Sequence, residues 1–210
     1  MTNKNRAWVL LNIPAFILSI YLALYPENYQ FVILAAAYCA LALLIGILLL
    51  NPLISIFPKQ KWIKRLNKYR QQIGVSCFIY ALIHAAGFVV KRGGILKAIP
   101  WIIHPVVLLG FASLSILFVL AITSNRFSMR KLGPRWKKLH KATYIAQWLI
   151  FFHMIFAGTT NNYVAALAFI PLVAFQLARR RKKEATQGLT RTSPTPNNLN
   201  PKAYVSGDSI

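Results

Sequence analysis

The feature that most constrains the fold is a series of long apolar runs, each close to the length that crosses a lipid bilayer. A hydrocarbon core of about 30 Å requires roughly 20 helical residues. The sequence therefore predicts an all-α membrane protein, a bundle of six transmembrane helices over residues 8–25, 31–57, 72–90, 101–123, 139–158 and 163–178. The second run contains Pro52, so we expect its helix to kink or end near Asn51.

A transmembrane β-barrel is the main alternative for so apolar a chain, which is 57% hydrophobic. Barrel strands are about 10 residues long and alternate apolar with polar side chains. The runs here are continuous and far longer. The pattern therefore favours helices, and it shows no internal repeat of the kind found in transporters.

The basic residues predict the orientation of the bundle. The chain has 25 lysines and arginines but only 3 acidic residues, Glu27, Glu184 and Asp208. If both termini are cytoplasmic, every basic residue except Lys91, Arg92 and Lys97 lies on the cytoplasmic side, as the positive-inside rule requires. The charge is segregated between apolar runs, which indicates contact with anionic membrane lipid. We therefore expect no nucleic acid partner.

The apolar body and the C-terminal end differ in composition. Residues 1–183 contain all the apolar runs and form the expected membrane domain. Residues 184–210 are rich in Ser, Thr, Asn and Pro, which predicts a disordered cytoplasmic tail. The basic start MTNKNR precedes an apolar run without a convincing small-residue cleavage site, so we interpret that run as an uncleaved first span.

Histidines within the apolar runs are the strongest candidates for function, because ionisable residues are rare in lipid. His84 lies about 18 Å, and His153 about 21 Å, along its helix from the cytoplasmic end, at a rise of 1.5 Å per residue. Two neutral imidazoles at one level on two helices are the axial ligands that a b-type haem requires. The alternative is that each histidine is a hydrogen-bonded structural residue; the matched depth favours metal or haem binding.

The other two histidines are weaker candidates. His140 lies 13 residues before His153, about 20 Å along the axis, but on an ideal helix the two side chains point to different faces. A second haem would need a partner near Arg70 or Gln71, and neither is a usual haem ligand. His140 is equally compatible with a basic interfacial residue. His104, in PWIIHPV, has the surroundings of an interfacial residue, and we favour that interpretation.

Two segments resemble a known family. YRQQIGVSCFIYALIHAAGF (69–88) is similar to the histidine-bearing third span of the ferric-reductase-like transmembrane family. LAITSNRFSMRKLGPRWKKLHKATYIAQWLIFFHMIF (120–156) is closer still, through its Thr-Ser pair, RKLGPRW, and two histidines 13 apart. It resembles the branch of that family formed by haem-binding membrane subunits of bacterial protein-methionine-sulfoxide reductases. The resemblance covers about residues 40–158.

The resemblance implies a haem-b bundle in the bacterial inner membrane, with one haem and a second left open. His84, His140 and His153 match the three histidines of the family, which would be cofactor-binding iron ligands. Electrons would pass from the quinone pool or a cytoplasmic flavin reductase to a periplasmic molybdopterin-containing subunit that reduces methionine sulfoxide. The family is also associated with FMN, although no motif here places one.

Three functions follow as hypotheses. The first is an electron-transfer subunit of an oxidoreductase complex, which would carry no catalytic residue of its own. The second is a ferric reductase-like electron carrier for another partner; the chain has no Gly-rich phosphate-binding fingerprint, so a flavin and nicotinamide domain would come from another chain. The third is a transporter or structural membrane protein without a cofactor.

Overall fold

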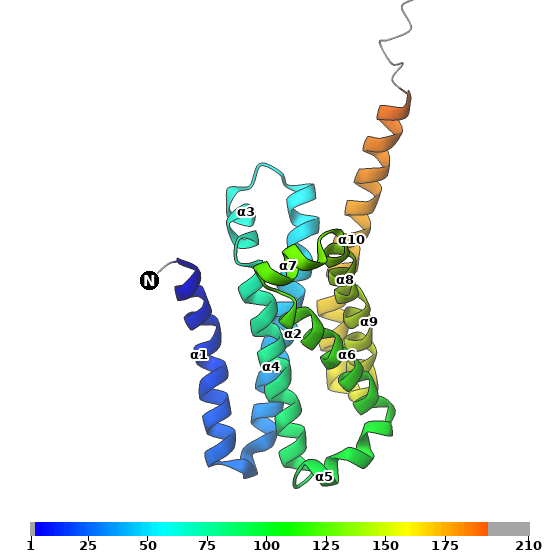
Figure 1. The fold of residues 1–210 in the computed structure, drawn as a ribbon. Helices are drawn as coiled ribbons and strands as arrows, with labels where there is room; N and C mark the ends of the chain where they lie inside the picture. Colours follow the sequence, from blue (N-terminus) through cyan, green and yellow to red (C-terminus); the bar gives the residue numbers. More distant parts are fainter. Residues whose placement is uncertain (1–2, 193–210) are drawn as a thin grey trace, which may run out of the picture.

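The computed structural model describes residues 3–192, apart from the side chains of residues 159–161, 183 and 186–192. Within this part the chain is helical nearly throughout and contains no strand (Figure 1). The elements are α1 (Asn3–Leu24), η1 (Pro26–Asn28), α2 (Tyr29–Ile56), α3 (Lys61–Asn67), α4 (Arg70–Lys91), α5 (Ile95–Ala98), η2 (Ile99–Ile103), α6 (Pro105–Ile122), α7 (Arg126–Leu132), α8 (Pro134–Leu139), η3 (His140–Ala142), α9 (Thr143–Ala157) and α10 (Thr159–Thr192).

Five helices of the described chain are long and apolar enough to cross a membrane: α1, α2, α4, α6 and α10. This confirms the all-α membrane class, whereas the sixth span remains a prediction. The expected fifth span over 139–158 is interrupted, because the 3₁₀ turn η3 separates α8 from α9. The α-helix that remains, α9, has 15 residues, or about 22 Å of length.

Two expectations about helix ends can be compared with the structure. α2 does not end near Asn51 but continues through Pro52 to Ile56, close to the predicted end of that run at residue 57, and a kink at Pro52 stays a prediction. Proline is tolerated within membrane helices because neighbouring groups can satisfy the backbone groups it frees. At the other end of the chain, residues 184–192 of the expected disordered tail are helical in α10. Residues 193–210 lie outside the described residues, so the domain boundary at residue 183 stays a prediction.

The bundle is organised around α2 and α4, which pack against each other along their length (Figure 1). One apolar core joins them to α6, α9 and α10 and includes Leu44, Leu117 and Leu172. A second core joins them to α1, through residues such as Ala15, Val32 and Tyr80. α4 contributes to both cores and also packs against α6, so the helix that carries His84 has neighbours on several sides.

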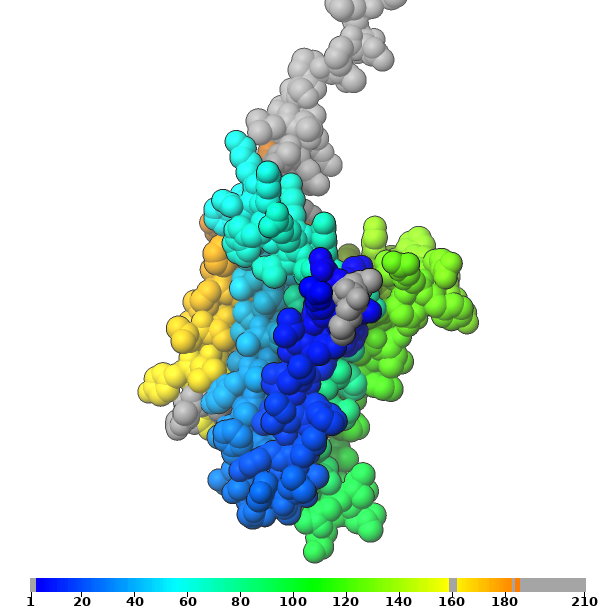
Figure 2. All heavy atoms as spheres, turned by 90° about the vertical axis from the view of Figure 1, so that its left-hand side faces the viewer, coloured from blue at the N-terminus to red at the C-terminus, as the bar shows by residue number. Residues whose placement is uncertain are grey.

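The outside of the bundle is apolar, as expected for a lipid-facing surface. α1 lies along the outside of α2 and α4 (Figure 2). Its side chains Leu10 and Phe16 are 71% and 68% exposed. An apolar surface of this extent would be a liability in water but is the normal exterior of a membrane helix. The structure therefore supports a multi-pass membrane protein.

The two basic loops lie at the same end of the bundle as both ends of the described chain (Figure 1). One loop contains α3 and the other contains α7 and α8. The second turns sharply at Gly133, whose φ of 49° lies in the left-handed region that glycine adopts readily. Pro134 then opens α8, where a missing N–H is not needed. The RKLGPRW string thus folds the loop back toward the bundle.

Candidate functional site

The structure brings His84 and His153 together, as their predicted depths required. His84 is carried by α4 and His153 by α9, and their ring centroids are 6.2 Å apart with the ring planes at 90°. Both side chains are partly buried. Two histidines that lie far apart in the sequence therefore meet inside the bundle. Their role as iron ligands remains a prediction.

Each ring is oriented by a backbone carbonyl of a neighbouring helix. Nδ1 of His84 lies 3.0 Å from the carbonyl oxygen of Ile33 in α2. Nδ1 of His153 lies 2.7 Å from that of Val106 in α6. A carbonyl oxygen only accepts, so in both rings Nδ1 carries the proton and donates. Both imidazoles consequently keep the Nε2 lone pair available.

This donor set fits a haem iron. Metal-ligating histidines characteristically donate their other ring N–H to a carbonyl or carboxylate, which sets the tautomer and ring orientation. A metal–imidazole bond is about 2 Å long, so two imidazoles on opposite sides of one metal have ring centroids roughly 6 Å apart. The observed 6.2 Å agrees with that value. His84 and His153 would hold the iron through Nε2.

Two glycines make this arrangement sterically possible. A Cβ at Gly110 would lie 3.0 Å from Cε1 and 3.1 Å from Nδ1 of His153. A Cβ at Gly87 would lie 2.6 Å from Cγ1 of Ile33, the residue whose carbonyl accepts from His84. Gly87 is buried, and its missing side chain allows α2 to approach α4 closely.

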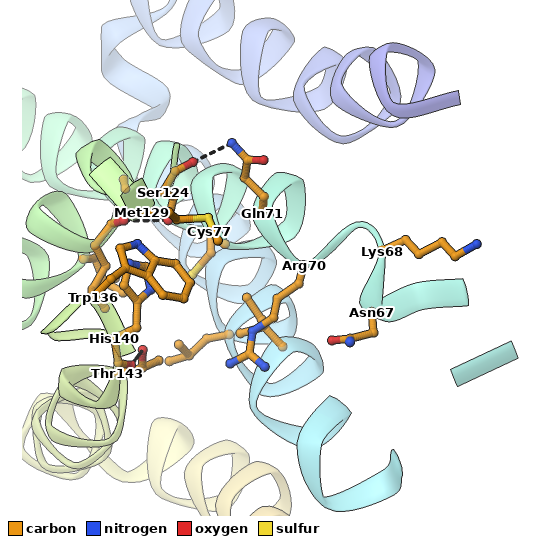
Figure 3. A pocket seen from close by; sticks show the side chains of 16 residues that line it. Asn67, Lys68, Arg70, Gln71, Cys77, Ser124, Met129, Trp136, His140 and Thr143 are labelled. Carbon is orange, nitrogen blue, oxygen red and sulfur yellow. Dashed lines mark hydrogen bonds between the residues drawn. The ribbon is translucent and has the colours of Figure 1, made fainter. Parts of the chain in front are cut away.

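The remaining histidines lie apart from this pair. His104 is exposed at the start of α6, with its ring centroid 6.1 Å from that of Trp101, in keeping with an interfacial position. His140 lies in η3 and borders a cavity of about 250 Å³ at the end of the bundle that carries the basic loops (Figure 3). No other histidine lines that cavity among the described residues. The structure therefore does not join His140 to the His84–His153 pair.

His140 has a different set of contacts from the paired histidines. Its ring stacks on Trp136, with centroids 4.0 Å apart, and its Nε2 lies 3.3 Å from Oγ1 of Thr123. The single hydroxyl proton of Thr123 is directed at the carbonyl oxygen of Val119, 2.7 Å away, so Nε2 of His140 is the donor. Burial lowers the pKa of His140, and the nearby charge of Arg70 lowers it further, which favours the neutral ring.

Several residues of these sites carry no signal of their own in the sequence. Ile33, Val106 and Gly110 act through a carbonyl or through a missing side chain, which any apolar span would hide. The indole Nε1 of Trp136 donates to the carbonyl oxygen of Thr123, and the ring of Trp136 stacks on His140. The spacing of four residues between Trp136 and His140 could have indicated that contact.

These observations define a class of protein: a helical membrane bundle in which two helices present a matched pair of imidazoles within the span. The sequence comparisons give the family. The profile described as "Ferric reductase like transmembrane component" matches residues 33–152, more than half of the chain. The chain belongs to this family, and it is a multi-pass protein of the bacterial inner membrane.

Individual relatives come from two groups. The chain is 36% identical over 126 residues to the magnetosome protein MamZ of Magnetospirillum gryphiswaldense, covering 57% of this chain and 19% of that one. It is 40% identical over 113 residues to the protein-methionine-sulfoxide reductase heme-binding subunit MsrQ of Agrobacterium fabrum, covering 52% and 50%. MsrQ of Brucella ovis is 45% identical over 84 residues, covering 39% and 38%.

The chain thus matches about a fifth of the magnetosome protein and at most half of these heme-binding subunits. The matched family region contains His84, His140 and Gly110, and it ends one residue before His153. No solved structure matches the chain.

Proposed function

We propose that this protein carries electrons across the membrane through a b-type haem held by His84 and His153. The observation that supports this most directly is the facing pair of imidazoles, each with Nδ1 donating to a carbonyl and Nε2 left available. Bound between two imidazoles, a haem iron accepts and releases one electron without needing a catalytic residue. The protein is therefore an electron-transfer subunit.

The residues around the pair orient and shield the cofactor. Ile33 and Val106 direct the two rings, and Gly110 admits the ring of His153. α2, α4, α6 and α9, which carry or contact the pair, pack against one another through apolar side chains. Exclusion of water and the hydrogen bonds on the ligands are the means by which a protein tunes a haem potential.

The partners proposed follow from the similarity to MsrQ and from the charge distribution. With six spans and both termini in the cytoplasm, the His84–His153 pair lies in the outer half of the membrane, nearer a periplasmic acceptor. We propose a molybdopterin-containing methionine sulfoxide reductase as that acceptor and the quinone pool or a cytoplasmic flavin reductase as donor. His140, on the cytoplasmic side, would bind or assist a second cofactor there; a second haem or FMN belongs to the same proposal.

A second candidate keeps the same chemistry but changes the partner. The similarity to the magnetosome protein MamZ, over a stretch as long as the match to MsrQ, supports a ferric reductase-like electron carrier that serves a different acceptor. The two candidates share the haem and differ in the protein that receives the electron.

The test is the visible spectrum of the purified protein in detergent, before and after dithionite. We expect a reducible b-type spectrum and a haem-to-protein ratio near one or two by pyridine haemochrome. A folded, monodisperse and colourless preparation from haem-replete cells would contradict the proposal and favour the cofactor-free transporter. If haem is present, co-expression with a periplasmic sulfoxide reductase distinguishes the partners: quinol-dependent sulfoxide reduction by membranes supports the first.

A further inference from the structure

An apolar segment at the end of the bundle opposite the basic loops lies outside the hydrocarbon layer. α4 has 22 residues, about 33 Å of helix, which already exceeds a hydrocarbon core of about 30 Å. α5 and η2, together residues 95–103, follow α4 and precede α6. Figure 2 shows this α5–η2 segment in green, projecting at the bottom of the molecule. Contact with acyl chains therefore does not account for its apolar side chains.

The α5–η2 segment is held in place, yet it leaves large apolar side chains exposed. Ala98 is buried, and α5 packs against α4. The guanidinium carbon of Arg92 lies 3.3 Å from the centroid of the Trp101 ring, a cation–π contact. Leu96 and Ile103, in contrast, are 80% and 84% exposed. Apolar side chains that a fold fixes in position and leaves uncovered outside the hydrocarbon mark an interaction surface.

Positive charge surrounds these apolar side chains. Lys91, Arg92 and Lys97 lie at this end, and the two lysines are exposed. Of the acidic residues in the described part of the chain, Glu27 lies at the same end, in η1, and Glu184 lies at the opposite end, in α10. Three basic residues against one carboxylate leave an excess of positive charge. A partner with carboxylates around an apolar centre complements this surface.

A short stretch of chain connects the α5–η2 segment with the histidine pair. The carbonyl oxygen of Val106, in the first turn of α6, accepts the hydrogen bond from Nδ1 of His153 at 2.7 Å. His104, the N-cap of α6, is exposed, and its ring centroid lies 6.1 Å from that of Trp101. The chain thus runs from the His153 ring to the exposed surface within a few residues. Because electron transfer slows steeply with distance, a carrier needs its redox site close to the surface where the acceptor docks.

We infer that the α5–η2 segment is the docking surface for a water-soluble electron-accepting protein, whose contact face has an apolar centre and an acidic rim. The inference rests on the proposed electron-transfer function and adds the place at which the electron leaves this chain. Leu96 and Ile103 supply the apolar contacts, and Lys91 and Lys97 steer the approach of the acidic partner.

The first measurement is the affinity of the full-length protein, in nanodiscs of dioleoylphosphatidylcholine, for a purified periplasmic methionine sulfoxide reductase, by biolayer interferometry. We expect Ile103→Ser to weaken binding at least about tenfold, because it removes an apolar contact from the centre of the interface. The matched control is Leu24→Ser, which alters an exposed apolar residue of α1 at the same end and should leave the affinity unchanged. A segment that lay on lipid head groups instead would give equal affinities for the two variants.

The second measurement locates the exit without a protein partner. The haem of the reduced protein is oxidised in a stopped-flow instrument by anionic hexacyanoferrate(III) or by cationic hexaammineruthenium(III), at low ionic strength. The positive rim predicts that Lys97→Glu slows oxidation by the anion and accelerates oxidation by the cation, each about threefold. Lys64→Glu makes the same change in an exposed residue of α3 at the opposite end and should alter neither rate.

The visible spectrum of the same samples separates failure of the inference from failure of the proposed function. A colourless protein contradicts the haem carrier and the inference that rests on it. With a reducible spectrum, the docking surface alone is overturned by equal affinities of Ile103→Ser and Leu24→Ser, by equal oxidation rates of Lys97→Glu and Lys64→Glu, or by a reductase that does not bind the unaltered protein.

Discussion

The imidazole of His153 occupies the space beside Gly110 of α6. A methyl group at residue 110 would lie 3.0 Å from Cε1 and 3.1 Å from Nδ1 of the ring. Val106, one turn earlier on the same helix, accepts the hydrogen bond from Nδ1. α6 therefore positions the His153 ring in two ways: the carbonyl of Val106 accepts its hydrogen bond, and the missing side chain of Gly110 leaves space for it.

Replacing Gly110 by alanine should displace the His153 ring and lower haem occupancy. The added methyl group lies inside the normal contact distance, so the ring must shift, and its hydrogen bond to Val106 opposes that shift. We expect the haem-to-protein ratio to fall at least several-fold, or the remaining haem to show an altered midpoint potential. Pyridine haemochrome and a redox titration measure the two effects.

Gly46→Ala is the control for that variant. Gly46 lies in α2 with open space around its Cα, so alanine there should be accommodated, with a gain in helix stability of roughly 0.5–1 kcal/mol. If the haem content were unchanged in both Gly110→Ala and Gly46→Ala, haem binding would not depend on the position that the His153 ring occupies in this structure.

Removal of either paired imidazole should abolish the outer haem. His84→Ala and His153→Ala each delete one of the two facing rings, whereas His104→Ala deletes an exposed residue outside the pair. We expect the reducible spectrum to disappear in the first two variants and to persist in the third. If His104→Ala alone removes the haem, the ligand assignment is wrong.

The contacts of Trp136 predict an effect on thermal stability at the cavity beside His140, separate from the His84–His153 pair. Trp136→Phe keeps an aromatic ring near His140 but removes the Nε1 donor, leaving the carbonyl of Thr123 without this partner. Loss of one such bond costs about 1 kcal/mol. We expect a lower thermal midpoint with an unchanged spectrum of the His84–His153 haem. A change in that spectrum would show that the two sites are coupled.

The orientation of the bundle is testable by labelling single cysteines with a membrane-impermeant maleimide. Lys64 in α3 and Lys97 in α5 are exposed and lie at opposite ends of the bundle. We expect Lys97→Cys to react in cells with a permeabilised outer membrane, and Lys64→Cys to react after the inner membrane is opened. The unaltered protein, with Cys39 and Cys77 in membrane helices, is the background control. The reverse pattern would invert the topology.

Much of this architecture could be predicted from the sequence, because lipid imposes a simple rule on the chain. A helix that satisfies its own backbone must be long and apolar to cross a membrane, so α1, α2, α4, α6 and α10 were visible as runs. The depth of a residue follows from the rise per residue, which is why His84 and His153 were expected at one level. The sequence also indicated that His140 would not share a face with His153.

The packing between helices could not be predicted from the sequence, because the rotation of each helix about its own axis depends on the neighbouring helices. The packing of α2, α4, α6 and α9 decides which carbonyl accepts a hydrogen bond from each histidine and why Gly110 must lack a side chain. It also brings Arg70 and His140 to the wall of one cavity. The break at η3 likewise belongs to the tertiary structure. Hydrophobicity and charge are properties of a single segment and can be read along the chain, whereas rotation and contact arise only when segments far apart in sequence pack together.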